Sequence, residues 1–300
     1  MHPITVVGSV ALDSIETPFG KVESVIGGSA THFSTSASFF APINLVGVVG
    51  NDFPKEHVKF LKSRNIDTKG LEIADGLTFS WKGYYDYDLN TAHTLETNLN
   101  VFETFDPKLP DSYKSAEFIF LANIDPELQL KVLEQTTQPK LVVMDTMNFW
   151  IESKKQHLIR TLQEVDIAMM NDAEARELSE THNLLDAARR ILGWGPTTVI
   201  IKKGEHGVLM FTDKTHFAAP AFPLEDIKDP TGAGDSFAGG FIGYLAKTND
   251  VTEANMRKAV IYASVMASFS VEDFSLNRFK RLTQKEIDGR YAHFEEMTIF

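Results

Sequence analysis

Short runs of consecutive apolar residues recur along the chain, and segments with helical periodicity separate them. The apolar runs lie at 4–10, 43–49, 118–122, 141–145, 166–170 and 198–203. Runs of this kind are typical of strands in a parallel sheet that is covered on both faces. The spacing of apolar residues predicts helices over 29–40, 126–136, 152–165 and 172–179. The alternation predicts an α/β fold, a doubly wound and mostly parallel sheet with helices on both faces.

Two segments break this rhythm, at 14–26 and 76–104, where apolar and polar residues alternate. Alternation and strong β formers predict antiparallel strands. The second segment carries Phe79 and Trp81 close together, and exposed aromatic surface often marks an interface or a ligand groove. We expect one domain over 1–300 with a small β-sheet lid from about 14–26 and 76–104. Two hairpins packed on the core remain the alternative.

Composition excludes several classes of protein. The 300-residue chain has a formal net charge of −12, whereas a nucleic-acid binder shows a basic stripe or patch. It has no cysteine, which excludes disulfides, thiolate zinc sites and cysteine nucleophiles. The first residues lack the basic start of a signal peptide, and no apolar run is long enough to span a bilayer. We therefore expect a cytoplasmic protein with neither nucleic-acid nor membrane partners.

The stretch DPTGAGDSFAGGF, at 229–241, concentrates glycine and proline before a segment with helical spacing. Asp229 precedes a proline, which disfavours helical backbone there. Gly232, Ala233 and Gly234 would then lie at a helix N-terminus, where backbone N–H groups have no partner within the helix. Such an N-terminus attracts phosphate, and glycine lets the backbone approach it closely. The stretch predicts an anion site.

Asp235 is unexpected beside a bound phosphate, because both are negatively charged. A carboxylate there makes sense if it removes a proton from a hydroxyl that attacks the phosphorus. The amides of Ala233, Gly234 and Asp235 would stabilise charge on the transferred phosphoryl group. The turn predicts phosphoryl transfer to an alcohol. The alternative is that Asp235 only caps the helix. Motifs of P-loop enzymes, dinucleotide-binding folds, protein kinases and zinc proteases are absent from the sequence.

Five segments together resemble the ribokinase-like (PfkB) family of carbohydrate and nucleoside kinases. In chain order they are VGSVALD (7–13), GGSATHFSTSASFF (27–40), MNDAEARELS (170–179), KKGEHGVLMF (202–211) and DPTGAGDSFAGGF (229–241). The resemblance covers essentially the whole chain and implies a ribokinase-like fold. It implies transfer of the ATP γ-phosphoryl group to a hydroxymethyl group of a small sugar. Asp235 would be the base, and the turn from Gly232 to Gly234 would be the anion hole.

The resemblance also implies residues for the acceptor. Asp13 would hold sugar hydroxyls, and we expect it at the end of the first strand, at the carboxyl edge of the sheet where ligands bind. Gly27 and Gly28 would let the acceptor lie against bare backbone. A loop-capping aspartate and a plain turn are the alternatives. His32 stands where many sugar kinases have an asparagine that touches the sugar; it is either a substrate contact or a satisfied core histidine.

Further acceptor residues follow from the strand ends. Asn123 and Asp125 lie where some relatives bind a substrate carboxylate, and Asp145 ends another predicted strand. Any of these side chains could face the acceptor.

Asn171 and Glu174 match the magnesium-associated motif of the family. Magnesium keeps several of its waters, so this pair would hold its water shell. A capping box is the competing interpretation, and both can be true together. Asp229 and Thr231 match positions that help to hold a monovalent cation in many relatives. A potassium site and a plain Asp-Pro-Thr turn explain them equally well.

The resemblance places the nucleotide along Lys202, Gly204 and Gly207, with Asn171 nearby. Side chains alternate along a strand, so one of Lys202 and Lys203 should point toward the phosphates, and the family pattern favours Lys202. Two solvated lysines are the alternative. Ser264 falls near the family's adenine-lining wall, although a helical core serine is the other interpretation.

Two other functions stay open. A nucleoside kinase, similar to adenosine kinase, could stack a base on Phe79, Trp81 or Tyr84. A non-catalytic sugar or nucleotide sensor could use the same fold. The expected partner is a small sugar or nucleoside, and a homodimer through the lid is plausible because exposed sheet surface tends to be covered. The sequence does not identify the acceptor, because one group in a pocket changes discrimination without changing a motif.

Overall fold

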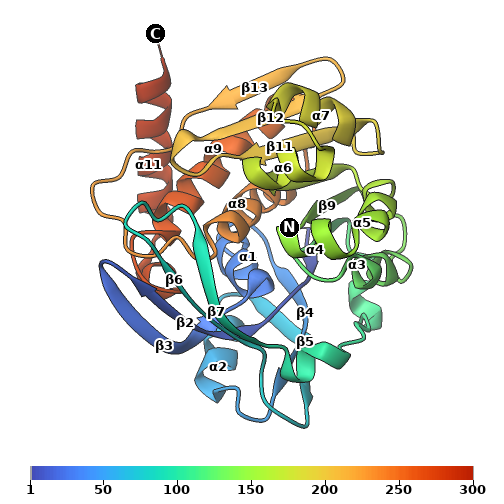
Figure 1. The fold of residues 1–300 in the computed structure, drawn as a ribbon, viewed down its shortest axis with the longest axis vertical. Coiled ribbons are helices and arrows are strands. Elements are labelled where there is room, and N and C mark those ends of the chain that lie inside the picture. The colour runs from blue at the N-terminus through green and yellow to red at the C-terminus, as the bar shows by residue number, and fades with distance from the viewer. Residues whose placement is uncertain (1, 300) are drawn as a thin grey trace.

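The computed structural model describes residues 2–299 and contains two β-sheets, of which the larger has helices on both faces (Figure 1). The nine strands of the large sheet run in the order β13-β12-β11-β10-β9-β8-β1-β4-β5. In chain order their bounds are β1 (Ile4–Val7), β4 (Ile43–Gly50), β5 (Ile66–Ala74), β8 (Phe118–Leu121), β9 (Leu141–Asp145), β10 (Ile167–Asn171), β11 (Thr198–Lys202), β12 (Val208–Thr212) and β13 (His216–Ala219).

The strands from β11 to β5 pair in parallel. Strands β12 and β13 add an antiparallel edge. The six apolar runs of the sequence form β1, β4, β8, β9, β10 and β11. The predicted mostly parallel α/β sheet is therefore confirmed.

Alternate residues of the strands face two different cores. Val6 and Phe120 lie in one core, and Val7 and Leu121 lie in the other. The first core contains residues of α1 (Ser29–Ala37), α2 (Lys55–Ser63), α8 (Ala233–Thr248), α9 (Glu253–Ser270), α10 (Asn277–Arg281) and α11 (Gln284–Thr298). The second contains residues of α3 (Pro126–Leu133), α4 (Asn148–Ser153), α5 (Lys155–Leu162), α6 (Asp172–Ser179) and α7 (Leu184–Leu192). Burial on both faces explains why the strands read as continuous apolar runs.

A second sheet, which we call the small sheet, stands off the large one at the lower left of Figure 1. Its strand order is β3-β2-β6-β7. The bounds are β2 (Ala11–Thr17), β3 (Gly20–Gly27), β6 (Ser80–Tyr85) and β7 (Ala92–Asn98). The segments expected to form antiparallel strands do form this sheet, but β2 and β6 pair in parallel. That expectation was wrong for the central pair, because β2 and β6 belong to different hairpins that meet side by side.

The first apolar run ends earlier than expected. Strand β1 stops at Val7, and the chain then enters the small sheet as β2. Asp13 therefore lies within β2 rather than at the end of the first strand, which corrects the prediction. The predicted helix over 152–165 is also two helices, α4 and α5, separated at Lys154, whose φ of −135° is not helical. Within residues 2–299, no helix has the length and apolar character needed to cross a bilayer.

Candidate active site

Helix α8 begins without a side-chain cap. Its N-cap residue, Gly232, has a left-handed backbone (φ 73°), and no side chain of the described residues caps the helix. A Cβ atom at Gly232 would come within 2.3 Å of the His32 ring, so no other residue fits this turn without a rearrangement. The Ala233 N–H donates to the Pro230 carbonyl at 3.1 Å. The N–H groups of Gly234 and Asp235 have no backbone acceptor within residues 2–299 and remain available for an anion.

Lys202, the last residue of β11, extends toward this turn. Its Nζ atom lies 2.6 Å from Oδ2 of Asp145, the last residue of β9. The same Nζ lies 3.0 Å from the position that a Cβ atom of Gly234 would take. Burial opposes the charge of Lys202, but the nearby carboxylates of Asp145, Glu174 and Asp235 outweigh it and raise its pKa. The expected lysine is thus a fixed cation beside the anion turn.

Carboxylates exceed cations around this lysine. Burial raises the pKa of Asp235 to about 7, with a further contribution from Asp145 and opposition from Lys202. Burial and then Asp145 likewise raise the pKa of Glu174 to about 7. The excess of negative charge would favour a cation that arrives with the nucleotide. Among residues 2–299, no three His, Asp or Glu side chains converge as a ligand set, so magnesium here would take most ligands from water and phosphate.

Helix α6 begins with a complete capping box. Asn171 Oδ1 accepts the Glu174 N–H at 2.8 Å, and a Glu174 carboxylate oxygen accepts the Asn171 N–H at 2.7 Å. This confirms the capping interpretation of the pair. Asn171 is the last residue of β10, which lies beside β11 in the sheet, and Glu174 follows it in the first turn of α6. Their predicted role in holding the magnesium water shell stays a prediction.

Asp13 reaches the same region from the small sheet. A Cβ atom at Gly27 would lie 1.9 Å from Asp13 Oδ2, so the carboxylate sits directly against the glycine. Burial and then the charge of Asp229 raise the pKa of Asp13 to about 7, although an N–H group of Gly28 partly offsets them. Gly28 is the N-cap of α1 and has a φ of 93°. Asp13 and the two glycines therefore form one wall of the site.

His32 lies between that wall and the anion turn. The side chain is buried, and its Nδ1 atom has no hydrogen-bond partner within residues 2–299. Burial lowers the pKa of His32 to about 4, so the ring is neutral. The alternative of a fully satisfied core histidine therefore does not describe Nδ1. A buried ring nitrogen without a partner is costly unless a ligand supplies one.

Comparison with known proteins agrees with this geometry. A model described as pfkB family carbohydrate kinase matches residues 1–280. The chain belongs to the PfkB family. It is 35% identical over 259 residues to a cytidine kinase of Thermococcus kodakarensis, which is 84% of this chain and 92% of that protein.

Solved structures share the PfkB fold over nearly the whole chain. The crystal structure of Methanocaldococcus jannaschii nucleoside kinase has a TM-score of 0.78 at 23% identity and covers 98% of this chain and 99% of that chain. The aminoimidazole riboside kinase of Salmonella enterica, complexed with aminoimidazole riboside and an ATP analog, has a TM-score of 0.78 at 16% identity and covers 96% and 99%. These likenesses show that the fold is that of ribokinase-family kinases.

Other predicted site residues of this PfkB kinase lie in different settings. Asp125 caps α3 by accepting the Glu127 N–H and pairs with Lys154 at 2.6 Å. Its predicted contact with the acceptor therefore competes with two structural bonds. Gly204 and Gly207 bound the turn after β11 with φ values of 54° and 85°. Ser264 is buried within α9, and its adenine contact stays a prediction.

Sequence reasoning missed Tyr85, the last residue of β6. Thr231 Oγ1 donates a hydrogen bond to Tyr85 Oη at 3.2 Å, which joins the small sheet to the loop before α8. A second link is the Thr17 hydroxyl of β2, which donates to the Lys228 carbonyl at 2.8 Å. The alternation of apolar and polar residues around Tyr85 predicts a strand, but it does not predict which side chain contacts the loop before α8. No motif marked it.

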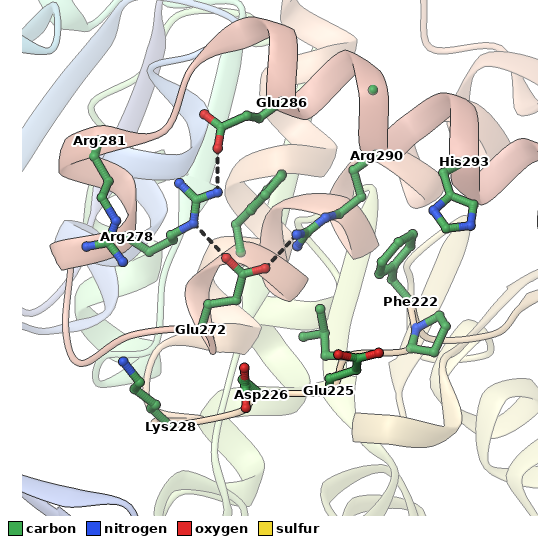
Figure 2. A pocket seen from close by; sticks show the side chains of 14 residues that line it. Phe222, Glu225, Asp226, Lys228, Glu272, Arg278, Arg281, Glu286, Arg290 and His293 are labelled. Carbon is green, nitrogen blue, oxygen red and sulfur yellow. Dashed lines mark hydrogen bonds and ion pairs between the residues drawn. The ribbon is translucent and has the colours of Figure 1, made fainter.

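A separate hollow of about 720 Å³ lies between the 222–228 segment and the last three helices (Figure 2). Asp13, Lys202 and Asp235 do not line it. Its centre is Glu272, which accepts hydrogen bonds from Arg278 and Arg290. Because its arginines are already paired with carboxylates, we assign this hollow a structural role, fixing the segment that leads to Asp229.

Proposed function

We propose that the protein transfers the γ-phosphoryl group of ATP to a hydroxymethyl group of a small sugar or of a nucleoside's sugar. The observation that carries the proposal is the uncapped start of α8, which combines free amides with the Asp235 carboxylate and the Lys202 ammonium. Free amides and a cation suit a phosphoryl group, and a carboxylate beside them suits a proton to be removed from an alcohol.

In this mechanism Asp235 takes the proton of the acceptor hydroxymethyl group. The acceptor oxygen forms a bond to the γ-phosphorus while the bond from that phosphorus to the bridging oxygen of ADP breaks. The amides of Gly234 and Asp235, together with Lys202, stabilise the charge on the transferred group. The Ala233 amide, also expected to do so, donates to the Pro230 carbonyl instead. Asp145 acts as a positioning residue for Lys202. Asp13 and the backbone of Gly27 and Gly28 hold the acceptor, with His32 between them and the turn.

We further propose two cation sites. Magnesium would neutralise phosphate charge, with Asn171 and Glu174 holding its water shell. The surplus of carboxylates around Lys202 supports this assignment. Potassium could bind beside Asp229 and Thr231. Asp229 is buried and accepts the N–H groups of Thr231 and Ser275, so it already organises the loop that would surround such an ion.

The small sheet would act as a lid that excludes water from the reacting groups. Its two hydrogen bonds to the 228–231 loop support this role. The sheet also exposes large apolar side chains, Phe19, Tyr87 and Leu95, at 50%, 81% and 60%. Such a surface favours cover by a second lid, so we propose a homodimer through the small sheet.

A nucleoside acceptor is the second candidate, and the 35% identity to a cytidine kinase favours it. The aromatic residues expected to stack on a base already have neighbours. Phe79 stacks on Phe102 and Tyr84 stacks on His93, while Trp81 Nε1 donates to Thr94. A base would therefore have to use the remaining ring faces.

The test is phosphorylation by the purified protein with ATP, magnesium and potassium. The acceptors are a panel of nucleosides, pentoses, hexoses and sugar acids, with products resolved by mass. Turnover with one class identifies it and supports the kinase assignment. ATP binding by calorimetry without phosphorylation of any acceptor would instead favour a nucleotide sensor.

A further inference from the structure

Tyr85 occupies a singular place among the tyrosines of the small sheet. Tyr84 stacks on His93 within the sheet, and Tyr87 is 81% exposed. Tyr85 instead extends to the loop before α8, where its Oη atom accepts a hydrogen bond from Thr231. Thr231 lies between Asp229 and Gly232, the N-cap of α8. The phenol is therefore located where the small sheet contacts the loop before α8.

The surroundings of this phenol keep its proton in place. Burial, followed by the charges of Asp229, Asp13 and Asp235, raises the pKa of Tyr85 to about 12, although the bond from Thr231 partly offsets them. The hydrogen bond with Thr231, the residue before Gly232, places the phenol next to the turn that begins α8. At neutral pH this side chain is therefore a hydrogen-bond donor among acceptors.

The phenolic proton has no hydrogen-bond acceptor within residues 2–299. Thr231 donates to Tyr85 Oη and so uses a lone pair rather than the proton. None of the hydrogen bonds of residues 2–299 gives the Tyr85 O–H an acceptor. A half-buried donor left free beside a substrate wall is suited to a ligand oxygen.

The chemistry of the neighbours defines that oxygen. Carboxylates such as Asp13 accept hydrogen bonds from the hydroxyl groups of a sugar. A phenol that donates complements them by binding an oxygen with lone pairs and no proton. In a furanose, the ring oxygen is bonded to the carbon that carries the hydroxymethyl group. It is therefore close to the oxygen whose proton Asp235 would remove.

We propose that Tyr85 donates a hydrogen bond to the ring oxygen of the acceptor sugar. The small sheet would thereby contribute a specificity-determining contact to the site. This inference rests on the proposed kinase function and deepens it. Because Thr231 holds the same phenol and adjoins the anion turn, binding of a furanose would align the acceptor with the transferred phosphoryl group.

The experiment combines a protein change with a matching ligand change. Tyr85→Phe removes the donor, and a carbocyclic acceptor replaces the ring oxygen by a methylene group. Tyr87→Phe, two residues away on the exposed turn, is the control. We measure kcat and KM for the acceptor identified by the panel and for its carbocyclic analogue, using wild type and both variants.

Tyr85→Phe should raise the acceptor KM about 10-fold, as expected for loss of one hydrogen bond, and change the KM for ATP less than about 2-fold. Wild type and Tyr87→Phe should prefer the natural acceptor to the carbocyclic one about 10-fold, and Tyr85→Phe should lose that preference. The preference is a ratio within one protein, so partial unfolding does not change it.

The outcomes separate this inference from the proposed function. If Tyr85→Phe keeps the wild-type preference for the ring oxygen, the inference is wrong while the kinase assignment stands. If wild type phosphorylates no acceptor of the panel, the proposed function fails and the inference fails with it.

Discussion

Helices α6 and α8 both begin at the carboxyl edge of the large sheet, yet their first turns are built in opposite ways. In α6, Asn171 and Glu174 close the turn with their own side chains. In α8, Gly232 takes a left-handed backbone and no side chain within residues 2–299 caps the helix. The first arrangement stabilises the helix, and the second leaves donors for a ligand.

The carboxylates of the two turns also differ in whether they cap their helix. Glu174 accepts the Asn171 N–H, whereas Asp235 makes no side-chain cap in α8. A carboxylate with a local partner is held in place by the fold. The Asp235 carboxylate does not cap its helix, and its burial raises its pKa to about 7. The comparison therefore supports a structural role for the start of α6 and the proposed reactive role for the start of α8.

A change in the first turn of α8 should have the largest effect on activity. Gly232→Ala would force a side chain into the left-handed region and against the His32 ring. We expect kcat/KM for ATP to fall about 100-fold, because the amides would no longer converge on the phosphoryl group. Gly289→Ala is the control, since a Cβ atom there meets nothing within 4 Å. Equal kinetics for the two variants would refute the role of the turn.

The pH dependence of kcat/KM tests the ionisation of Asp235. Asp235 must be ionised to act as a base, and its pKa is raised to about 7 in the free protein. kcat/KM should therefore fall as the pH drops below about 7 and approach a tenfold loss per pH unit. The measurement is initial rates at subsaturating acceptor between pH 5 and 9. A rate that stays constant down to pH 5.5 would contradict the action of Asp235 as a base with a pKa near 7.

Removing the cap of α6 tests the other turn. Asn171→Ala should lower the free energy of unfolding by about 1 kcal/mol. If the pair also holds magnesium, the metal concentration for half-maximal rate should rise about tenfold. Asn183→Ala removes the cap of α7 and should cost similar stability with unchanged kinetics. Matching magnesium dependence in the two variants would leave capping as the only role of Asn171.

The smallest effect concerns stability. A raised carboxyl pKa means that the folded protein binds the proton more tightly, so this contribution is present below pH 4 and is lost as the pH rises through about 7. Asp235→Asn should therefore raise Tm at pH 8 by about 2–5 °C and have less effect at pH 5. Thermal scans at both pH values give the result. Equal shifts at the two pH values would show that Asp235 is not destabilised by its charge.

The large sheet could be predicted from the sequence because strands that are buried on both faces consist of continuous apolar residues. Continuous apolar runs located β1, β8 and β9, and the glycine-rich turn located the start of α8. The capping box of α6 was visible in the same way, since it depends on residues three apart.

The remaining features depend on contacts between distant segments. The run through Gly8 and Ser9 does not show that β1 ends at Val7 and that Asp13 belongs to the small sheet. Tyr85 and Thr231 are distant in sequence and come into contact only in the folded protein. The orphan Nδ1 atom of His32 is also invisible without its neighbours.

The central claim is that Asp235 serves the chemistry and not the helix. The direct measurement is ATP affinity and single-turnover phosphorylation on the same preparation of Asp235→Asn, beside wild type. The account predicts a Kd for ATP within about threefold of wild type and a phosphoryl-transfer rate reduced at least about 1,000-fold. A variant that transfers the phosphoryl group at the wild-type rate would contradict it, and Asp235 would then be no more than part of the first turn of α8.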